Sequence, residues 1–448
     1  MHTIPQLREV ERQFGNELVI IGVHAGKFHA ERITGNIQQA VLRLGIDHPV
    51  VNDRQFHVWR SHAISAWPTL VFINPDGRFI GAQAGELPAE AIAHVIRGII
   101  QDFDSQGKID RKPIPIQLER AREPERPLAF PGKVLAAGDR RLFIADSNHH
   151  RILAVRLDEA STSGTVEAIA GKGQAGFSDG SLPSATFRSP QGMAHVGGLL
   201  YVADTGNHAI RCIDWSKNTV TTVAGTGRQA RFSEAGGTGP LVALNSPWDV
   251  LHHDGQLYIA MAGSHQIWRL DIAGGPIHPH AGTGGEALED GPLARALLAQ
   301  PSGLTTDGTR LYFADSEASA IRWADFPESG AVGTIVGTGL FDFGNKDGIG
   351  EQVRLQHPLG VAWHEGKIYV ADTYNNKIKA VEAASRTSQT IEVIAGSGDE
   401  ATSPATFNEP GGLSVSAERI YVADTNNHRI CVIDLRTRQV SRVELNGI

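Results

Sequence analysis

Cysteine is scarce in this chain of 448 residues: there are two, Cys212 and Cys431, and aromatic residues make up only 6%. Two cysteines so far apart in sequence form neither a disulfide framework nor a metal-binding pair, so we expect buried, inert thiols. No apolar run reaches the roughly 18–20 residues that a membrane-spanning helix needs. The first twenty residues also lack the charged-then-apolar pattern of a signal peptide, which favours a cytoplasmic location.

Positive charge is also in short supply. The formal net charge is −8, and residues 133–448 contain 26 Lys and Arg against 34 Asp and Glu, which accounts for the whole excess. A net acidic region attracts phosphate backbones poorly, so the composition disfavours nucleic acid as a partner. What is abundant is glycine, with 50 residues, and this predicts many turns.

Three landmarks recur in the same order along most of the chain. The first is an apolar-aromatic run such as LYVAD, found at 142–146, 200–204, 257–261, 311–315, 368–372 and 420–424. A proline precedes each copy: Pro131, Pro190, Pro247, Pro301, Pro358 and Pro410. A glycine-rich segment such as VAGTG follows five of them, at 169–173, 223–227, 280–284, 335–339 and 394–398. Such a period indicates a repeat architecture.

Each repeat reads as four short β-rich runs separated by Gly, Asn, Asp and Ser turns. The second copy runs GMAHV, LLYVAD, AIRCID and TVTTVAG. Four strands per unit at this period predict a β-propeller, in which neighbouring sheets bury each other's faces. Residues 128–448 therefore form six blades, with no room for a seventh. Because closed blades leave few free edges, we expect a monomer.

The most conspicuous motif, YVADTNNHRI at 421–430, falls in the turn between the second and third strands of a blade. Asp and Asn side chains suit such turns because they bond local backbone N–H groups. We therefore expect a structural role, without chemistry, for the repeated carboxylates Asp146, Asp204, Asp315, Asp372 and Asp424.

This pattern resembles the NHL repeat. The resemblance rests on Pro-x-Gly, on YVADTxNHRI, and on AGxG followed by Asp-Gly at 179–180, 290–291 and 347–348. It implies a six-bladed NHL propeller. Such propellers are usually interaction modules, and some bind RNA.

The N-terminal region has a mixed pattern. Residues 17–24 predict a strand, 28–45 a helix, 67–85 two strands around an Asp-Gly turn, and 88–101 an amphipathic helix. This order, with Trp67-Pro68-Thr69 just before a strand, resembles a thioredoxin fold. That resemblance implies a cis-proline loop formed by these three residues, with Pro68 cis.

Together the two parts resemble the NHL repeat-containing protein 2-like family, on GVHAGKF at 22–28, AVLRLGIDHPVVND at 40–53 and AWPTLV at 66–71. In that family a cysteine-containing segment precedes a His-x-x-Pro pattern like the one at 2–5. Here the thioredoxin-like domain is incomplete: it lacks the first strand, and it has no cysteine for the low-pKa thiolate that thiol chemistry needs. Either the start codon lies upstream of Met1, or the domain is redox-inactive.

We therefore predict three segments. Residues 1–104 form an α/β thioredoxin-like domain, 105–127 a Pro-rich and charge-rich linker, and 128–448 an all-β six-bladed NHL propeller. An alternative is that residues 113–119, PIPIQLE, add an outer strand to a blade.

Breaks in the repeat are candidate functional positions. In the third copy the Asp becomes Met261, and the glycine two residues after proline becomes Asp249. We expect Trp248, Asp249 and His265 to share one end of the propeller, with Asp249 near the central channel. Neutral drift of one repeat is the alternative.

Histidine recurs at one repeat position and predicts a ring on that face: His150, His208, His265 and His428. Equivalent residues on separate blades diverge, so they cannot meet at about 2 Å from one zinc ion. We interpret them as turn-stabilising groups, with a ligand-binding surface as the alternative. The pattern His278-Pro279-His280 stands alone.

The predicted function is a non-catalytic scaffold that needs no cofactor and binds a protein or small ligand on the propeller loop face. One alternative is a thiol-disulfide oxidoreductase whose Cys-x-x-Cys lies upstream of Met1. Another is a propeller hydrolase or lyase with a metal in the channel.

Overall fold

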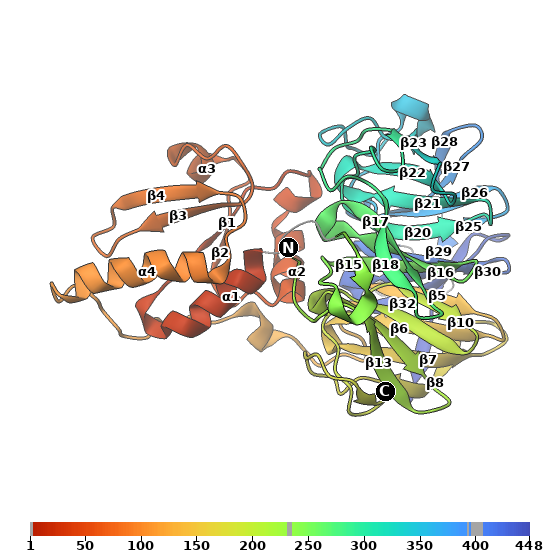
Figure 1. The fold of residues 1–448 in the computed structure, drawn as a ribbon, viewed down its shortest axis with the longest axis horizontal. Coiled ribbons are helices and arrows are strands. Elements are labelled where there is room, and N and C mark those ends of the chain that lie inside the picture. Colours follow the sequence, from red (N-terminus) through yellow and green to blue (C-terminus); the bar gives the residue numbers. More distant parts are fainter. Residues whose placement is uncertain (1–2, 231–234, 392–393, 396–405) are drawn as a thin grey trace. The chain divides into compact units, whose positions relative to one another are not determined.

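The computed structural model describes residues 3–230, 235–391, 394–395 and 406–448 (Figure 1). The chain divides into two compact units, Met1–Glu125 and Arg126–Ile448. Within the described part, no helix is both long enough and apolar enough to cross a bilayer.

The second unit is a six-bladed β-propeller, and each blade is a five-stranded sheet (Figure 1). The four main strands of each blade run antiparallel in chain order from the channel outward. Blade one has β5 (Lys133–Ala137), β6 (Arg141–Asp146), β7 (Arg151–Leu157) and β8 (Ser163–Ala170), and blade two has β10 (Met193–Val196), β11 (Leu199–Asp204), β12 (Ala209–Asp214) and β13 (Thr219–Ala224). Blade three has β15 (Pro247–His253), β16 (Gln256–Met261), β17 (Gln266–Asp271) and β18 (Pro276–Ala281), and blade four has β20 (Pro301–Thr306), β21 (Arg310–Asp315), β22 (Ala320–Asp325) and β23 (Ala331–Val336). Blade five has β25 (Gly360–His364), β26 (Lys367–Asp372), β27 (Lys377–Glu382) and β28 (Thr387–Thr390), and blade six has β30 (Pro410–Ser416), β31 (Arg419–Asp424), β32 (Arg429–Asp434) and β33 (Gln439–Arg442).

The core of the propeller lies in the layers between neighbouring blades. One such layer joins Tyr201 and Cys212 of blade two to Leu257 and Trp268 of blade three. The second strand of each blade is buried along nearly its whole length, because both of its faces meet another sheet. This explains why the apolar runs recur as near-continuous stretches.

The fifth strand of most blades comes from the connection that precedes the blade. The Asp-Gly segments supply β9 (Gly180–Ser181), β19 (Gly291–Pro292) and β24 (Gly348–Ile349), and β14 (Gly237–Thr238) is their counterpart in blade three. Each pairs antiparallel with the fourth strand of the blade that follows. In blade six, β29 (Ile394–Ala395) pairs in parallel with β33. The rest of the fifth glycine-rich landmark, 396–398, lies outside the described residues.

Blade one takes its outer strand from the other end of the propeller. β34 (Glu444–Asn446) pairs in parallel with β8, so that blade is completed by residues far away in sequence. The alternative that residues 113–119 add an outer strand is wrong, because this Pro-rich stretch forms no strand. A short 3-10 helix, Glu119–Arg122, follows it.

The first unit contains α1 (Thr3–Phe14), β1 (Gly22–His24), α2 (Thr34–Leu44), β2 (Val50–Asn52), α3 (His57–Ser61), β3 (Thr69–Ile73), β4 (Phe79–Ala84) and α4 (Ala89–Asp104). The predicted strand at 17–24 is confirmed only over 22–24, since only these residues pair with β2. The predicted helix at 28–45 begins at Thr34, after a 3-10 turn over Ala30–Arg32.

The core of the first unit packs α1 against α4, through Val10 and Phe14 on one side and Ile92 and Ile96 on the other. Its strands form two separate two-stranded sheets, β1–β2 in parallel and β3–β4 as a hairpin. The start of the predicted linker is tied to this unit, because Arg111 pairs with Asp104 at 2.7 Å.

Candidate functional site

The repeated aspartates lie at the end of the second strand in five blades, and their carboxylates bond the protein itself. Asp204 is fully buried, and its Oδ1 accepts the N–H of Arg188 at 2.7 Å. Its Oδ2 accepts Nδ2 of Asn207 at 2.8 Å and Nη1 of Arg211 at 2.9 Å. Burial raises the pKa of Asp204 to about 6, and Arg211 opposes that shift. The side chain has no oxygen directed to solvent, which agrees with the structural role expected from the sequence.

A buried cation links this carboxylate to the Asp-Gly segment of the same blade. Arg211 bonds Asp204 through Nη1, and its Nη2 bonds Oδ1 of Asp179 at 2.7 Å. Asp179 also accepts the backbone N–H of Thr222 at 3.0 Å, so one arginine connects three strands. Blade four has the same arrangement with Asp315, Arg322 and Asp290, and blade five has it with Asp372, Lys379 and Asp347.

In blade three all three members of this network are replaced together. Met261 takes the position of the first aspartate, Trp268 that of the arginine, and Gly236 that of the second aspartate. Met261 and Trp268 are buried at 1% and 3% exposure in one apolar cluster. Nε1 of Trp268 donates to Oε1 of Gln266 at 2.9 Å. The three positions of the ionic network have thus changed together, and the two large side chains pack in one apolar cluster. This argues against neutral drift at a single position.

The recurring histidines join each blade to the next one. His150 Nδ1 accepts the N–H of Ser189 at 3.1 Å, and Ser189 comes directly before the proline of the following blade. His208 accepts from Ser246 at 3.0 Å and His428 from Phe130 at 3.1 Å in the same way. In blade five Asn376 has this role, with the N–H of Glu409 at 2.8 Å.

His265 differs from the other three histidines. Its Nδ1 is shielded from solvent and has no hydrogen-bond partner in the described part of the chain. In each of the other three histidines, Nδ1 accepts a backbone hydrogen bond inside the fold, so the turn-stabilising interpretation fits them.

The central channel is crossed by an ion pair. Lys133 of β5 and Asp249 of β15 lie on blades one and three, and Nζ is 3.6 Å from Oδ2. Their side chains are only 7% and 13% exposed. Nζ also donates to the carbonyl oxygens of Ser302 at 2.9 Å and Leu359 at 2.5 Å, on blades four and five. One ammonium therefore connects four blades across the axis.

The carboxylate of Asp249 is held by backbone as well as by the lysine. It accepts the N–H of Leu304 at 3.0 Å and that of Val250 at 2.9 Å. Burial raises the pKa of Asp249 and lowers that of Lys133, and in each case the partner's charge opposes the shift. At Gly192 of blade two a Cβ would lie 2.0 Å from Oδ1 of Asp249, so that blade needs its glycine.

Asp249 therefore lies at the channel, as expected, but it is not an exposed group on a binding face. Trp248 beside it is partly exposed, and its carbonyl oxygen accepts the N–H of Gly192 at 3.1 Å. Lys133 was not predicted as a channel residue, although the sequence contains a signal for it. Of the six positions two residues after the repeat proline, four are glycine and the other two carry opposite charges.

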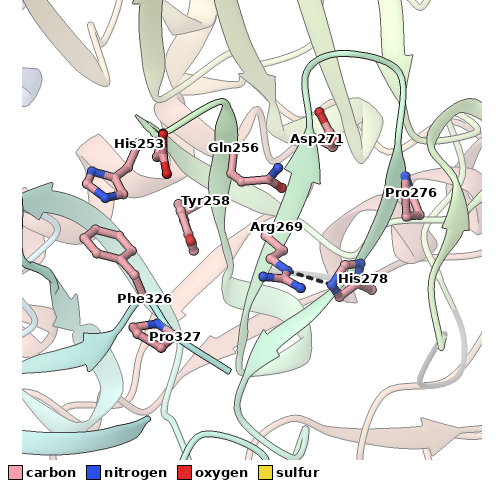
Figure 2. Close-up of a pocket in the computed structure, with 10 residues that line it drawn as sticks. His253, Gln256, Tyr258, Arg269, Asp271, Pro276, His278, Phe326 and Pro327 are labelled. Carbon is pink, nitrogen blue, oxygen red and sulfur yellow. Dashed lines mark hydrogen bonds between the residues drawn. The ribbon is translucent and has the colours of Figure 1, made fainter. Parts of the chain in front are cut away.

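An open concavity lies on blade three, at the end opposite the turn that holds His265. It has a volume of about 490 Å³. Figure 2 shows its side chains, which come from the strands of blade three and from the segment after β22 of blade four. They are His253, Asp254, Gln256, Tyr258, Arg269, Asp271, Pro276, His278, Phe326 and Pro327.

One wall of this pocket is apolar and aromatic. The rings of His253 and Phe326 stack with centroids 3.8 Å apart and planes at 6°. Tyr258 lies next to them, with its ring centroid 5.1 Å from that of Phe326. Burial raises the pKa of the Tyr258 hydroxyl, so it stays protonated.

The polar side of the pocket is net acidic. Nε of Arg269 donates to Nε2 of His278 at 2.7 Å, so that imidazole is neutral (Figure 2). Burial, and then the charge of Arg269, lowers the pKa of His278. The guanidinium also pairs with Glu328, which balances its charge. Asp254 and Asp271 then leave the pocket with excess negative charge.

The first unit holds its predicted loop in the expected form: the peptide bond between Trp67 and Pro68 is cis. Nε1 of Trp67 donates to the carbonyl oxygen of Ala25 at 2.7 Å, and the hydroxyl of Thr69 donates to that of Ala66 at 2.7 Å. The first unit itself contains no cysteine, because Cys212 and Cys431 both belong to the propeller.

Both cysteines are unreactive in their surroundings. They are free and buried, and burial raises the pKa of Cys212 to about 11 and that of Cys431 to about 12. A thiol with so high a pKa has almost no thiolate at neutral pH. The prediction that both thiols are buried is confirmed, and their raised pKa values agree with low reactivity.

The chain matches the NHL repeat family over residues 187–213 and 407–433. It is 38% identical to NHL repeat-containing protein 2 of Bos taurus over 98% of this chain and 65% of that protein. It is 38% identical to Protein SUPPRESSOR OF QUENCHING 1, chloroplastic, of Arabidopsis thaliana over 100% of this chain and 44% of that protein. Among solved structures, a chain of the nidogen/laminin complex is 14% identical, with a TM-score of 0.45 over 68% of this chain and 92% of that one.

The chain thus spans just under two thirds of the bovine relative, 65% of its length. The identity covers both units, and the propeller with its NHL turns agrees with the name of that relative. Over nearly its whole length the chain is therefore similar to NHL repeat-containing protein 2, and it carries NHL repeats.

Proposed function

We propose that this chain is a monomeric, non-catalytic interaction scaffold whose propeller binds a partner protein or a small ligand. The observation that supports it most directly is the use of the repeated polar groups. Asp204 and its equivalents, and the histidines of three blades, make their hydrogen bonds inside the fold. Groups engaged in this way do not serve as general acids, bases or metal ligands.

A channel metal is disfavoured by the residues on the axis. Hard cations take carboxylate and carbonyl oxygens as ligands. The oxygens of Asp249, Ser302 and Leu359 already surround the ammonium of Lys133. A lysine in the place of a metal gives no Lewis acid, so this argues against a hydrolase or lyase built on the channel.

The pocket on blade three suits a basic or planar side chain of a partner. Asp254 and Asp271 supply negative charge, while Glu328 balances Arg269. The stacked rings of His253 and Phe326 offer an aromatic wall for a guanidinium or a ring. We therefore assign this pocket, rather than the His-ring face, as the primary ligand position.

The test uses two small probes, N-acetyl-L-arginine amide and N-acetyl-L-glutamine amide, titrated into the full chain and followed by calorimetry. We expect saturable binding of the arginine probe only, weakened at least fivefold in Asp254→Asn/Asp271→Asn. Asp139→Asn, in the equivalent exposed turn of blade one, is the matched control and should bind as the parent does. Equal binding by all three proteins, or none by the parent, would reject the pocket. Steady turnover of a disulfide substrate by residues 1–448 would reject the non-catalytic role.

A second candidate is thiol-disulfide oxidoreduction, with the reactive cysteines outside residues 1–448. It is favoured by the split sheet of the first unit, where β1 pairs with β2 and β3 with β4 but the two halves do not pair. Val23 of β1 and Ile73 of β3 are 44% and 55% exposed, so a further strand would have apolar surface to cover. The reading frame upstream of Met1 and the mass of the native protein decide this. An in-frame Cys-x-x-Cys supports the redox function, and a native start at Met1 rejects it.

A further inference from the structure

Two neighbouring turns of blades five and six bring together an imidazole and two carboxylates. His364 ends β25, Glu365 follows it in the turn to β26, and Glu418 lies in the turn between β30 and β31. One ligand atom from each side chain lies within 4.8 Å of the other two. His364 and Glu365 are adjacent, whereas Glu418 lies 54 and 53 positions further along the chain and meets them because consecutive blades stack.

The group has the composition of a transition-metal site. Around a tetrahedral zinc, ligand atoms at about 2.0–2.2 Å from the metal lie roughly 3.3–3.6 Å from each other. Glu365 is exposed and Glu418 is half-buried, and the ligand atoms lie within 4.8 Å of one another, so modest side-chain movements would be needed to reach that spacing. An imidazole among the ligands favours Zn²⁺ or Co²⁺ over Ca²⁺ and Mg²⁺, which prefer oxygen ligands alone.

A second observation singles out His364. Its Nε2 is shielded from solvent and has no hydrogen-bond partner in the part of the chain that the structure describes. A buried, unsatisfied polar atom in a native fold calls for an explanation. A metal ion bound at this nitrogen would satisfy it and would fix the tautomer and position of the ring.

Within the described residues, neither carboxylate is in an ion pair with lysine or arginine. Both act on Tyr369: burial raises the pKa of its hydroxyl first, the charges of Glu365 and Glu418 raise it further, and Arg438 opposes them. The two carboxylates thus act on one common region, together with the positive charge of Arg438.

We propose that His364, Glu365 and Glu418 bind one divalent transition-metal ion, with water completing its coordination. The ion joins blade five to blade six at the face opposite the NHL turns. The corresponding turns of blades three and four contain only part of this group. His253 and Asp254 occupy the corresponding turn, but the next blade offers Thr309 where Glu418 stands, and its hydroxyl bonds Asp307. His195→Ala of blade two is the matched control, because its Nε2 likewise has no hydrogen-bond partner among the described residues, but it belongs to no such group with carboxylates.

The experiment starts from the full chain after chelator treatment and exchange into metal-free buffer. CoCl₂ is titrated and followed by visible absorption, and ZnCl₂ is titrated by calorimetry and by thermal unfolding. We expect one equivalent of Co²⁺ with d–d bands, and a rise of several degrees in the unfolding midpoint with Zn²⁺. His364→Ala and Glu418→Gln should lose at least tenfold in affinity and the thermal shift, whereas His195→Ala should keep both.

Two results would contradict the proposed metal site. If the parent binds no saturable equivalent, or if Glu418→Gln and His364→Ala bind as tightly as the parent, the site is wrong. Glu418→Gln changes one partly exposed side chain without changing its size, so circular dichroism should show an intact fold. If it does not, Glu365→Gln, at a fully exposed position, gives the same test. None of these results depends on the blade-three pocket.

Discussion

The ammonium of Lys133 lies 3.6 Å from the carboxylate of Asp249 across the propeller axis. At the position two residues after the repeat proline, four blades have glycine, and Lys133 and Asp249 are the two exceptions. The charge of each side chain compensates that of the other. Their charges are held by backbone groups of two further blades. The channel of this propeller is therefore closed by side chains rather than left open for a ligand.

Removal of one member of this pair should destabilise the propeller strongly. Lys133→Met leaves Asp249 buried and uncompensated, which costs about 3 to 5 kcal/mol in the free energy of unfolding. Lys133→Gly/Asp249→Gly restores the residue of the other four blades and should be more stable than Lys133→Met. Urea unfolding measures both, with Lys172→Met at an exposed site as the control. A double variant less stable than Lys133→Met would contradict this account.

Blade three should not tolerate the aspartate that its neighbours need. Met261→Asp places a carboxylate in the apolar cluster that contains Trp268 and should cost about 3 kcal/mol or more. Met261→Leu keeps the volume and apolar character and should cost less than about 1.5 kcal/mol. Thermal and urea unfolding distinguish the two. Equal stability of Met261→Asp and the parent would show that this blade is not repacked as described.

The stability of the propeller should fall in mild acid because of His428. Its neutral Nδ1 accepts the N–H of Phe130, and burial lowers its pKa from 6.5 to about 4. Since the folded pKa is below the unfolded one, the contribution is complete above pH 6.5 and is lost as pH falls toward 4. It amounts to about 2 to 3 kcal/mol.

His428→Asn provides the control for this pH dependence. Asn376 makes the same bond in blade five through an amide that does not titrate. The variant should retain stability near pH 7 and lose less of it between pH 6.5 and 4 than the parent. Unfolding midpoints at several pH values test this, and identical slopes would assign the acid sensitivity to other groups.

Neither cysteine should react in the folded protein. Cys212 and Cys431 are 9% and 0% exposed, and their raised pKa values leave almost no thiolate at pH 8. Alkylation with iodoacetamide, followed by mass spectrometry, should find both thiols unmodified in buffer and both modified in denaturant. Rapid labelling of the native chain would show that a thiol is accessible.

The blades could be predicted from the sequence because their signals are local. Runs such as LYVAD, with their turns and prolines, repeat at almost constant spacing, so strand order and blade number follow from them. The structural role of Asp204 was predictable for the same reason, since an aspartate in a turn bonds neighbouring backbone. Its partner Arg211 lies seven residues away and shares the repeat.

Contacts between distant residues were not predictable in this way. Lys133 and Asp249 are 116 positions apart, and each alone resembles an ordinary charged residue. The pocket on blade three combines Arg269 with Phe326 of the next blade, and no motif marks the pair. The parallel pairing of β34 with β8 depends on closure of the whole ring.

That pairing has a consequence for biosynthesis. Blade one is among the first parts of the propeller to be made, yet its outer edge is covered only by residues 444–446. Domains tend to fold as they are synthesised, from the N-terminal end. Here the strand edge on β8 stays open until residues 444–446 have been translated, and open edges invite wrong partners. A ribosome that stalls, or a nonsense mutation, a few codons before residue 444 would therefore leave five complete blades and an unpaired edge on β8 of blade one.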